Sequence, residues 1–566
     1  MSGQQVIGYF PKVAFVLGLF ACVDAIAAPY NIGSPALRNI WVDVVQGDDS
    51  RSGQDESSAI RTVAEAWRRI PQGSELSGAG YQILLLPGEY RAEHLPSYWE
   101  NRLGTATAPI VIKSVYADRQ AIFRHDINLF NGRYIYFINF QITPDPAGDV
   151  FHCEQCNHIL LRGMTLNGMG GGVRAAHETI KINQSQHIYI EHSEIFGSYE
   201  NNIDFVAVQY GHVVGNRIHD ADDWCAYAKG GSAYLRFESN KIYNCGTGGF
   251  TAGQGTGFEY LTNPWLHYEA YDIKFINNLV WNTEGAGFGA NGGYNILFAF
   301  NTLYRVGTRS HGLEVVFGSR SCDGEVGKCR TNRAAGGWGP ETTGSEEPIP
   351  NRNVFIFNNL LLNPPGVESR WSHFAIHGPR SASPGSNIES PVRTDVGLVI
   401  RGNAIWNGSP GLSLGLGEDS GCNNSNTTCN ETQLRGQNAI NTVRPILLAP
   451  ESEDFRPNIS GLPLALEIPS FPGDDLQSRP QAPQGMLTNL VDRDYSGSSR
   501  VSTSVIGPLL PNSSLQPGDG IDAPPGGGND GGDNGGSPQP GTDIAIQQAL
   551  ISPQRLGPYG GRVAVV

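Results

Sequence analysis

The sequence has little positive charge and few long hydrophobic runs. Its 566 residues include 39 Lys and Arg against 54 Asp and Glu, which gives a formal net charge of −15. Proteins that bind nucleic acid through its phosphates need a basic surface, so this balance argues against general nucleic-acid binding. The negative net charge does not exclude an acidic polymer as substrate, because such a polymer needs only a local basic groove. After residue 27, no stretch is long and apolar enough to span a membrane as a helix.

Helix-forming stretches are also scarce, whereas glycine is frequent. The chain contains 72 Gly and 36 Pro, and hydrophobic residues make up 39%. That fraction is enough for a core but low for a helical bundle, so the composition predicts many short strands joined by tight turns. At about 150 residues per domain the length suggests three or four domains, a count that an internal repeat overrides.

Residues 1–27 have the pattern of a secretory signal peptide. Lys12 precedes an apolar run at residues 13–21, and Ala25-Ile26-Ala27 forms a small-residue cleavage site. We therefore predict cleavage after Ala27 and export to the periplasm, the cell surface or the medium. Lipoprotein anchoring at Cys22 is the alternative, and Phe20 fits its cleavage box poorly.

Removal of the signal peptide leaves eight cysteines in four close pairs. The pairs are Cys153/Cys156, Cys225/Cys245, Cys322/Cys329 and Cys422/Cys429. An even set of closely spaced cysteines in an exported protein predicts four disulfides. A zinc site on the first pair is the alternative, but a lone CxxC without a second pair nearby is weak evidence for zinc.

A short phrase recurs through the middle of the chain: apolar β-prone residues, an asparagine, two or three apolar residues and a turn. The equivalent asparagines are Asn216, Asn240, Asn278, Asn301, Asn359 and Asn403. A strand-turn-strand unit that returns every ~20–25 residues predicts an all-β, right-handed parallel β-helix. Stacked coils would place these amides in a hydrogen-bonded ladder, so their role is structural.

The rest of the chain follows from this repeat. Apolar residues at helical spacing in residues 57–70 predict a helix that caps the N-terminal end of the solenoid. We assign residues 28–511 to the β-helix domain and expect a monomer. Residues 512–543 are rich in Gly and Pro and are predicted to be a disordered linker, followed by a short segment of unassigned role at 544–566.

The densest set of chemically reactive side chains lies on three consecutive coils. It comprises Glu200, Asn202, Asp204, His219, Asp220, Asp222, Asp223 and Lys229. Several carboxylates on rigid strands suit Ca²⁺, so Asp204, Asp222 and Asp223 are predicted metal ligands. A lysine beside them can have a lowered pKa, which makes Lys229 a candidate base. Alternatively, the aspartates are ordinary turn residues and Lys229 is solvated.

The segment from Asp222 to Ser232, ending at Asn244-Cys245-Gly246, resembles exported β-helix carbohydrate enzymes. It is most similar to polysaccharide lyases of the alginate lyase, chondroitinase B and calcium-dependent pectate lyase type. The resemblance implies that Lys229, just before Gly230-Gly231-Ser232, is the base, with a calcium ligand at Asp222 or Asp223. Those lyases carry an Arg-His-Gly motif one coil further on, where this chain has residues 251–255 without an arginine.

A weaker resemblance connects the same region to polygalacturonase-like hydrolases. Their Asn-x-Asp resembles Asn202-Ile203-Asp204, and their Asp-Asp-Cys resembles Asp222-Asp223 with Cys225 displaced by one residue. This resemblance implies inverting hydrolysis by paired carboxylates. Their Gly-His-Gly corresponds to residues 246–249, which contain no histidine. A non-catalytic carbohydrate-binding protein is the third class.

A second polar cluster follows at residues 304–314. We predict Arg309 and His311 as catalytic residues and Glu314 as a substrate-binding residue, because arginines here could bind substrate carboxylates. Tyr227 and Tyr268 are predicted to contact sugar rings. The alternative is loop packing and surface ion pairing. The sequence thus predicts a secreted, calcium-assisted lyase that cleaves a uronic-acid-containing polysaccharide by β-elimination.

Overall fold

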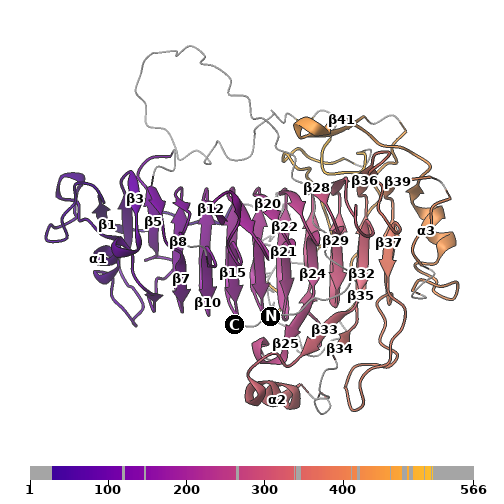
Figure 1. Ribbon diagram of the computed structural model, residues 1–566, viewed down its shortest axis with the longest axis horizontal. Helices are drawn as coiled ribbons and strands as arrows, with labels where there is room; N and C mark the ends of the chain where they lie inside the picture. Colours follow the sequence, from indigo (N-terminus) through magenta and orange to yellow (C-terminus); the bar gives the residue numbers. More distant parts are fainter. Residues whose placement is uncertain are drawn as a thin grey trace, which may run out of the picture.

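The computed structural model describes residues 29–513, except 118–120, 146–147, 263–266, 337, 339–345, 410, 417–420, 459–460, 474–480, 484–487, 502–503 and 511–512. These residues form a right-handed parallel β-helix with three long parallel sheets (Figure 1). The predicted signal peptide, the predicted linker apart from Ser513, and the segment 544–566 lie outside the described residues.

Most coils contribute a strand to each of three sheets, which we call sheets A, B and C. Sheet A contains β1 (Leu37–Val42), β2 (Gly80–Leu85), β5 (Ile110–Ser114), β8 (Arg133–Ile138), β11 (Asn157–Arg162), β16 (Gln186–Glu191), β19 (Gln209–Val214), β22 (Ser232–Glu238), β26 (Ala270–Tyr271), β27 (Lys274–Ile276), β30 (Gly293–Ala299), β35 (Arg352–Phe357) and β38 (Val399–Arg401). Sheet B contains β3 (Gly88–Tyr90), β6 (Ala121–Phe123), β9 (Gln141–Ile142), β12 (Thr165–Asn167), β17 (Glu194–Ser198), β20 (Arg217–Ala221), β23 (Lys241–Cys245), β28 (Leu279–Thr283), β31 (Thr302–Tyr304), β36 (Leu360–Asn363), β39 (Ala404–Asn407) and β40 (Ala439–Ile440). Sheet C contains β4 (Trp99–Glu100), β7 (Ile127–Phe130), β10 (Phe151–Glu154), β15 (Ile180–Asn183), β18 (Ile203–Val206), β21 (Trp224–Lys229), β24 (Gly248–Gly253), β29 (Ala286–Asn291), β32 (Leu313–Val316) and β37 (Phe374–Ile376).

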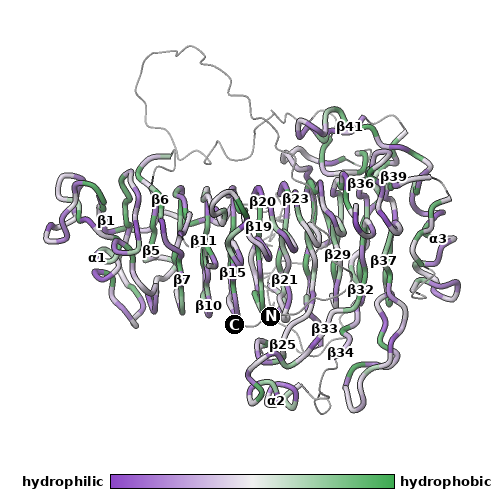
Figure 2. The backbone as a smooth tube through the Cα atoms, viewed as in Figure 1, coloured by the Kyte–Doolittle hydropathy of each residue, from purple (hydrophilic) through white to green (hydrophobic). Residues whose placement is uncertain are grey.

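Side chains alternate between the inside and the outside of the solenoid. In β18, for example, Ile203 and Phe205 are fully buried in the central core, and Asp204 between them faces outward. Figure 2 shows the matching alternation of hydrophobic and hydrophilic residues along the strands. Because the strands pair in register, equivalent residues of successive coils form columns. Successive residues within a column are about 4.8 Å apart.

The predicted asparagine ladder is confirmed. The backbone N–H of Asn216 donates to Oδ1 of Asn240 at 3.0 Å, and the same contact continues through Asn278, Asn301, Asn359 and Asn403. It reaches one coil further than predicted, to Asn438. Every amide of the ladder is buried, so these hydrogen bonds satisfy polar groups that would otherwise be costly to bury.

All four predicted disulfides are present. They join Cys153–Cys156, Cys225–Cys245, Cys322–Cys329 and Cys422–Cys429. The second of them links β21 of sheet C to β23 of sheet B.

The predicted N-terminal helix is shorter than expected. A 3-10 turn, η1 (Glu56–Ser58), precedes α1 (Val63–Arg68), whose N-cap is Thr62. The side chain of Thr62 accepts a hydrogen bond from the backbone N–H of Glu65. Figure 1 places α1 beside β1, at the N-terminal end of the solenoid.

The remaining elements decorate the coils. They are η2 (Ala92–His94), β13 (Met169–Gly170), β14 (Val173–Arg174), β25 (Gly255–Gly257), η3 (Phe258–Tyr260), β33 (Gly318–Ser321), α2 (Val326–Ala335), β34 (Glu347–Ile349), α3 (Glu431–Gln437), β41 (Ile446–Ala449), η4 (Pro450–Ser452) and β42 (Asp454–Asn458). The group of β25, η3, β33, α2 and β34 projects from one side of the solenoid (Figure 1). Parts of residues 446–509 pack on the outer faces of sheets A and B. Among the described residues, no helix is long and apolar enough to cross a membrane.

Candidate active site

The outer face of sheet C gathers titratable side chains from neighbouring coils. Lys181, Asp204 and Tyr227 occupy the same register position on β15, β18 and β21. Thr251 follows on β24 and Glu314 lies two strands further, on β32. The column runs parallel to the solenoid axis, so a linear ligand lying along the axis would pass these side chains in turn.

Asp204 is the buried carboxylate of this column. Its residue surface is only 3% exposed, and Nζ of Lys181 lies 3.8 Å from its Oδ2. Its other carboxylate oxygen, Oδ1, is buried and accepts no hydrogen bond in the part of the chain that is described. Burial alone would lower the pKa of Lys181, but nearby carboxylates, Asp204 foremost, outweigh it and raise the pKa. The lysine therefore stays protonated.

Glu178 supplies a second buried carboxyl group next to Asp204. It accepts hydrogen bonds from the backbone N–H and the Nδ2 of Asn201, at 2.8 and 3.3 Å. Burial raises the pKa of Glu178 well above its ordinary value, and the negative charge of Asp204 adds to this effect. Glu178 therefore favours the protonated form and can act as a proton donor.

Lys229 lies on the same face, at the end of β21. Its ammonium group sits 4.4 Å from the centre of the Tyr227 ring and donates to Oε1 of Gln254 at 2.9 Å. The side chain is half-buried. Burial raises the pKa of Tyr227 well above its ordinary value, so its phenol stays protonated. The hydroxyl accepts a hydrogen bond from Nδ2 of Asn201 at 3.3 Å.

Two further carboxyl groups border Lys229. Burial raises the pKa of Asp223, against the opposing effects of a hydrogen bond with Thr247 and the charge of Lys229. Burial also raises the pKa of Glu200, and the charge of Asp223 contributes. The structure thus brings Asp204, Asp223, Glu200 and Lys229 of the predicted cluster to one face.

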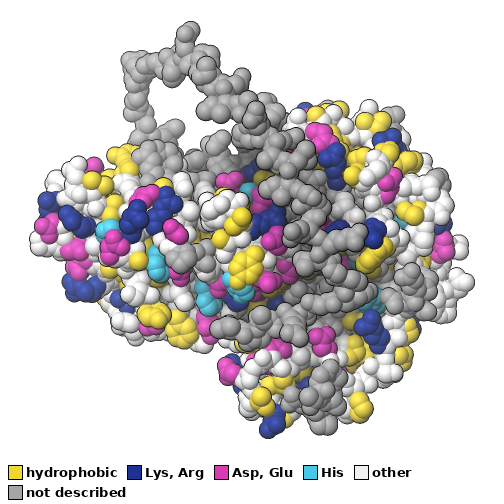
Figure 3. All heavy atoms as spheres, viewed as in Figure 1, with side chains coloured by type: hydrophobic (Ala, Val, Ile, Leu, Met, Phe, Trp, Pro, Cys, Tyr) yellow, Lys and Arg dark blue, Asp and Glu magenta, His cyan; other side chains and the backbone are white. Residues whose placement is uncertain are grey.

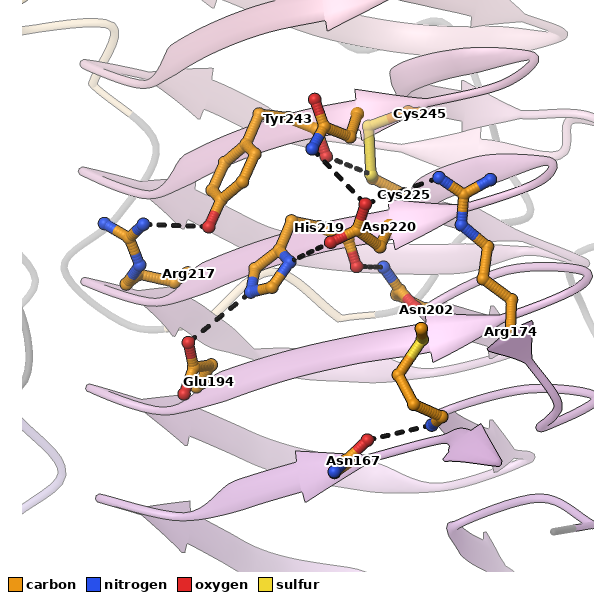
Figure 4. Close-up of polar contacts among 12 residues, drawn as sticks. Asn167, Arg174, Glu194, Asn202, Arg217, His219, Asp220, Cys225, Tyr243 and Cys245 are labelled. Carbon is orange, nitrogen blue, oxygen red and sulfur yellow. Dashed lines mark hydrogen bonds and ion pairs between the residues drawn. A yellow bond between two sulfur atoms is a disulfide. The ribbon is translucent and has the colours of Figure 1, made fainter. Parts of the chain in front are cut away.

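The other members of the predicted cluster lie elsewhere. Asp222 is exposed and forms an ion pair with Arg174 from the β13–β14 hairpin. Nδ1 of His219 lies 2.7 Å from Oδ2 of Asp220, on the side of sheet B, as Figure 4 shows. Asn202 is fully buried and donates to the carbonyl of His219 at 2.6 Å, so its role is structural.

The His219 group on sheet B is a cluster of charged and polar side chains. Nε2 of His219 lies 3.5 Å from a carboxylate oxygen of Glu194, and Arg174 approaches Asp220 at 3.3 Å (Figure 4). Burial would lower the pKa of His219, but hydrogen bonds to Asp220 and Glu194 outweigh it and raise the pKa. The imidazole is stacked between Phe196 and Tyr243, at centroid distances of 4.8 and 4.5 Å.

The second predicted cluster lies further along sheet C. Nε2 of His311 contacts Oε2 of Glu314 at 2.9 Å, and both side chains are 13% exposed. Arg309 instead points to an exposed ion pair with Glu284. From Tyr227 to Glu314 is three coils, or about 14 Å, so this pair lies on the same face but at a distance from Lys229. Tyr268 is buried in an aromatic cluster with Tyr271 and Tyr294.

The three predicted metal ligands do not converge on one point. Asp222 pairs with Arg174, while Asp204 and Asp223 belong to separate coils. Within the described ranges, the one group of three potential metal ligands is Asp395 with Cys422 and Cys429, and these cysteines form a disulfide. The three aspartates therefore do not form one calcium site, and we derive no catalytic step through calcium.

Sequence reasoning missed Lys181 and Glu178. Both carry a signal that was available: Lys181 stands 23 residues before Asp204, which stands 23 residues before Tyr227. Glu178 stands at the same interval before Asn201, with which it is hydrogen-bonded. The coil period that located the ladder thus also locates the polar column. On the face that Figure 3 shows, acidic and basic side chains are interspersed outside the grey atoms, without a broad basic patch.

No known family profile and no curated protein sequence matches this chain. Similar solved structures include a rhamnogalacturonan lyase, with 13% identity, a TM-score of 0.40 and coverage of 65% of this chain and 87% of that chain. The pectate lyase Pel9A has 13% identity and a TM-score of 0.38 over 59% of this chain and 78% of that chain. XylC in complex with xylose has 9% identity and a TM-score of 0.43, with coverages of 84% and 98%. At these identities the likeness concerns the fold alone.

Proposed function

We propose that the outer face of sheet C is the active site of an exported polysaccharide lyase, which cleaves a uronic-acid-containing chain by β-elimination. The observation that carries the proposal is the column of Lys181, Asp204 and Tyr227, with Lys229 beside it on the same face. It combines a candidate base with a lysine whose pKa is raised, and both lie on strands of the solenoid.

Elimination requires a base that removes a proton and a cation that stabilises the negative charge on the uronate. Lys229 removes the proton from the carbon next to the uronate carboxylate. The electron pair of that C–H bond forms a double bond to the neighbouring carbon, and the glycosidic oxygen leaves that carbon with its bonding pair and takes up a proton from water. The negative charge that develops on the carboxylate needs a cation. Lys181 supplies it, because the surrounding carboxylates raise its pKa and keep it protonated.

Export is part of the proposal and is supported by the four disulfides, which form in oxidising compartments. N-terminal sequencing of the protein recovered outside the cytoplasm tests it: a mature chain that begins at Ala28 is expected. Calcium assistance stays a prediction of the sequence. A chelator titration followed by calcium addition tests it, with turnover and melting temperature as readouts.

The decisive experiment is a substrate screen of the mature, disulfide-bonded protein against alginate, pectate, glycosaminoglycans and rhamnogalacturonan. Ultraviolet absorbance reports unsaturated uronate ends, and a reducing-end assay runs in parallel. We expect both signals to rise together on one polymer. On that polymer, Lys229→Met should lower turnover about 10³-fold, whereas Lys328→Met, at an exposed position of α2, should leave it unchanged. Unaltered turnover in Lys229→Met would refute the assignment of the base.

Inverting hydrolysis is the second candidate, and one observation favours it. Burial and the charge of Asp204 raise the pKa of Glu178, so this pair offers a general acid and a second carboxyl group. Reducing ends that rise without ultraviolet absorbance would establish this reaction. Glu178→Gln would then abolish turnover, and Lys229→Met would not.

A further inference from the structure

A long pocket of about 730 Å³ opens along the corner where sheet C ends and sheet A begins. Its lining includes one register column, Glu75, Arg133, Asn157, Gln186 and Gln209, with Gly104 and Thr105 from the intervening coil. Five steps of about 4.8 Å make this column about 24 Å long. The pocket is therefore a groove parallel to the solenoid axis, with room for a segment of a linear chain. We call it the corner groove.

The corner groove is lined by side chains that hydrogen-bond without carrying charge. Its two charged residues, Glu75 and Arg133, face each other at 3.3 Å and neutralise one another. The other polar side chains are amides and hydroxyls. Nε2 of Gln186 donates to Oε1 of Gln209 at 2.8 Å, and Nδ2 of Asn157 donates to Oε1 of Gln186 at 3.5 Å. Gln209 is only 3% exposed, so Asn157 and Gln186, which are half-buried, are the amides that a ligand can reach. An amide carries two donor hydrogens and an acceptor oxygen with two lone pairs, so the hydrogen bonds between these side chains do not use all of its positions.

Two features fix the shape of the groove. Tyr134 stacks on His158 with ring centroids 4.1 Å apart, and His158 stacks on His187 at 4.2 Å. Gly104 faces Tyr134, and a Cβ at this glycine would come within 2.9 Å of the Tyr134 carbonyl oxygen. A glycine is therefore required where the backbone of these coils comes closest.

The corner groove leads to the candidate active site. Ala207 lines it, and the backbone N–H of Ala207 donates to the carbonyl of Lys229 at 2.9 Å. On the far wall, Nε2 of Gln184 donates to the carbonyl of Tyr260 in η3 at 3.0 Å. A chain that passes Lys229 on sheet C therefore enters a groove of different chemistry within one coil.

We infer that the corner groove binds a segment of uncharged sugar residues. Sugar hydroxyls both donate and accept hydrogen bonds, and so do the amides that line the groove. A polyuronate would place one carboxylate on every sugar, and each would need a cation or lose its hydration uncompensated. The groove offers one arginine, which Glu75 already neutralises.

Combined with the proposed function, on which this step rests, the groove defines the substrate class. The polymer is a mixed one, with a uronate at the sheet C face and neutral sugars on the N-terminal side of Lys229. A homopolymer of uronates, in contrast, would have to place charges along the whole groove.

The test measures binding separately from turnover. The mature protein carrying Lys229→Met is titrated in a calorimeter with three neutral hexasaccharides, xylohexaose, galactohexaose and cellohexaose, and with hexagalacturonate. We expect at least one neutral hexasaccharide to bind, and Gln186→Trp, which fills the groove, to weaken this binding at least tenfold. Gln209→Ala, which removes the acceptor that holds the Gln186 amide in place, should weaken it about threefold. Gln46→Trp, at an exposed position in a loop, should not change it.

Two results overturn the inference. One is that none of the neutral hexasaccharides binds in a manner sensitive to Gln186. The other is that hexagalacturonate binds more tightly than all three neutral hexasaccharides and that Gln186→Trp weakens its binding at least tenfold. The groove would then be a site for charged chains. If neutral binding depends on Gln186 while no polymer yields unsaturated ends, the groove stands and the lyase proposal fails.

Discussion

The outer faces of sheets B and C are built by the same coils, yet they use their charged side chains differently. On sheet B, Glu453 from the C-terminal part of the chain lies 2.9 Å from Arg217 and 2.8 Å from Lys241. Phe455 from the same segment packs against Trp281. On sheet C, Lys181 remains 25% exposed, and Oδ1 of Asp204 has no hydrogen-bond partner in the described chain.

Charged side chains on sheet B pair with a later segment and stabilise the fold, whereas the lysines on sheet C stay accessible to a ligand. Where the C-terminal segment covers sheet B, Glu453 pairs with both Arg217 and Lys241. On sheet C, which this segment leaves uncovered, burial raises the pKa values of Glu178, Asp223 and Glu200. Perturbed carboxyl groups beside an open face are typical of functional sites.

The largest expected effect is on the open face. Asp204→Asn removes the charge that holds Lys181 and should lower turnover at least 10²-fold, because Lys181 would lose its position and part of its pKa elevation. The melting temperature should change little, since the new amide keeps the shape of the side chain. Steady-state kinetics on the polymer found in the screen, with thermal unfolding in parallel, check both statements. A loss of stability without a loss of turnover would make sheet C a structural face like sheet B.

The matched substitution on the covered face is Glu453→Gln. It breaks charged hydrogen bonds to Arg217 and Lys241 and should lower the free energy of unfolding by about 2 kcal/mol, with turnover unchanged. Arg217 and Lys241 hold the pKa of Glu453 at about 2, below its usual 4.5. This stabilisation is therefore present above pH 4.5 and is lost as the pH falls towards 2. Denaturant unfolding of both proteins across this range checks the prediction, and parallel pH profiles would contradict it.

A smaller effect is expected at His219. Its pKa is raised in the folded protein, so its protonated form adds stability below pH 6.5, and this contribution is lost as the pH rises through the folded-state pKa. In the native protein the free energy of unfolding should fall by less than about 1 kcal/mol as the pH rises above 6.5 and His219 loses its proton. In His219→Gln this decrease should be absent. Identical pH profiles for the two proteins between pH 6 and 9 would show that the imidazole contributes nothing.

The coil period made most of the fold predictable from the sequence. The ladder asparagines recur because the backbone N–H of each donates to the side-chain oxygen of the next. Their spacing in the sequence therefore follows the length of a coil and any insertion in it. The same spacing relates Lys181, Asp204 and Tyr227, so this column on sheet C was predictable in principle. The four disulfides were predictable because their cysteines are close in sequence.

Directions of side chains at the turns were not predictable. Asp222 and Asp223 are adjacent, yet the first points to Arg174 and the second lies near Lys229. A shift of one residue moves a side chain to the other face of a strand, and the sequence does not reveal where the turn between two sheets begins. Arg174 comes from a hairpin 48 residues before its partner, a contact that no local pattern encodes.

The asparagine ladder also has a consequence for how such a protein can be changed. The backbone N–H of Asn278 meets Oδ1 of Asn301 at 2.8 Å across 23 residues, and that of Asn301 meets Oδ1 of Asn359 at 2.9 Å across 58 residues. The junction between coils is thus indifferent to how much chain is inserted between them. Segments inserted between coils, such as the group of β25, η3, β33, α2 and β34, therefore leave the register of the coils beneath them intact.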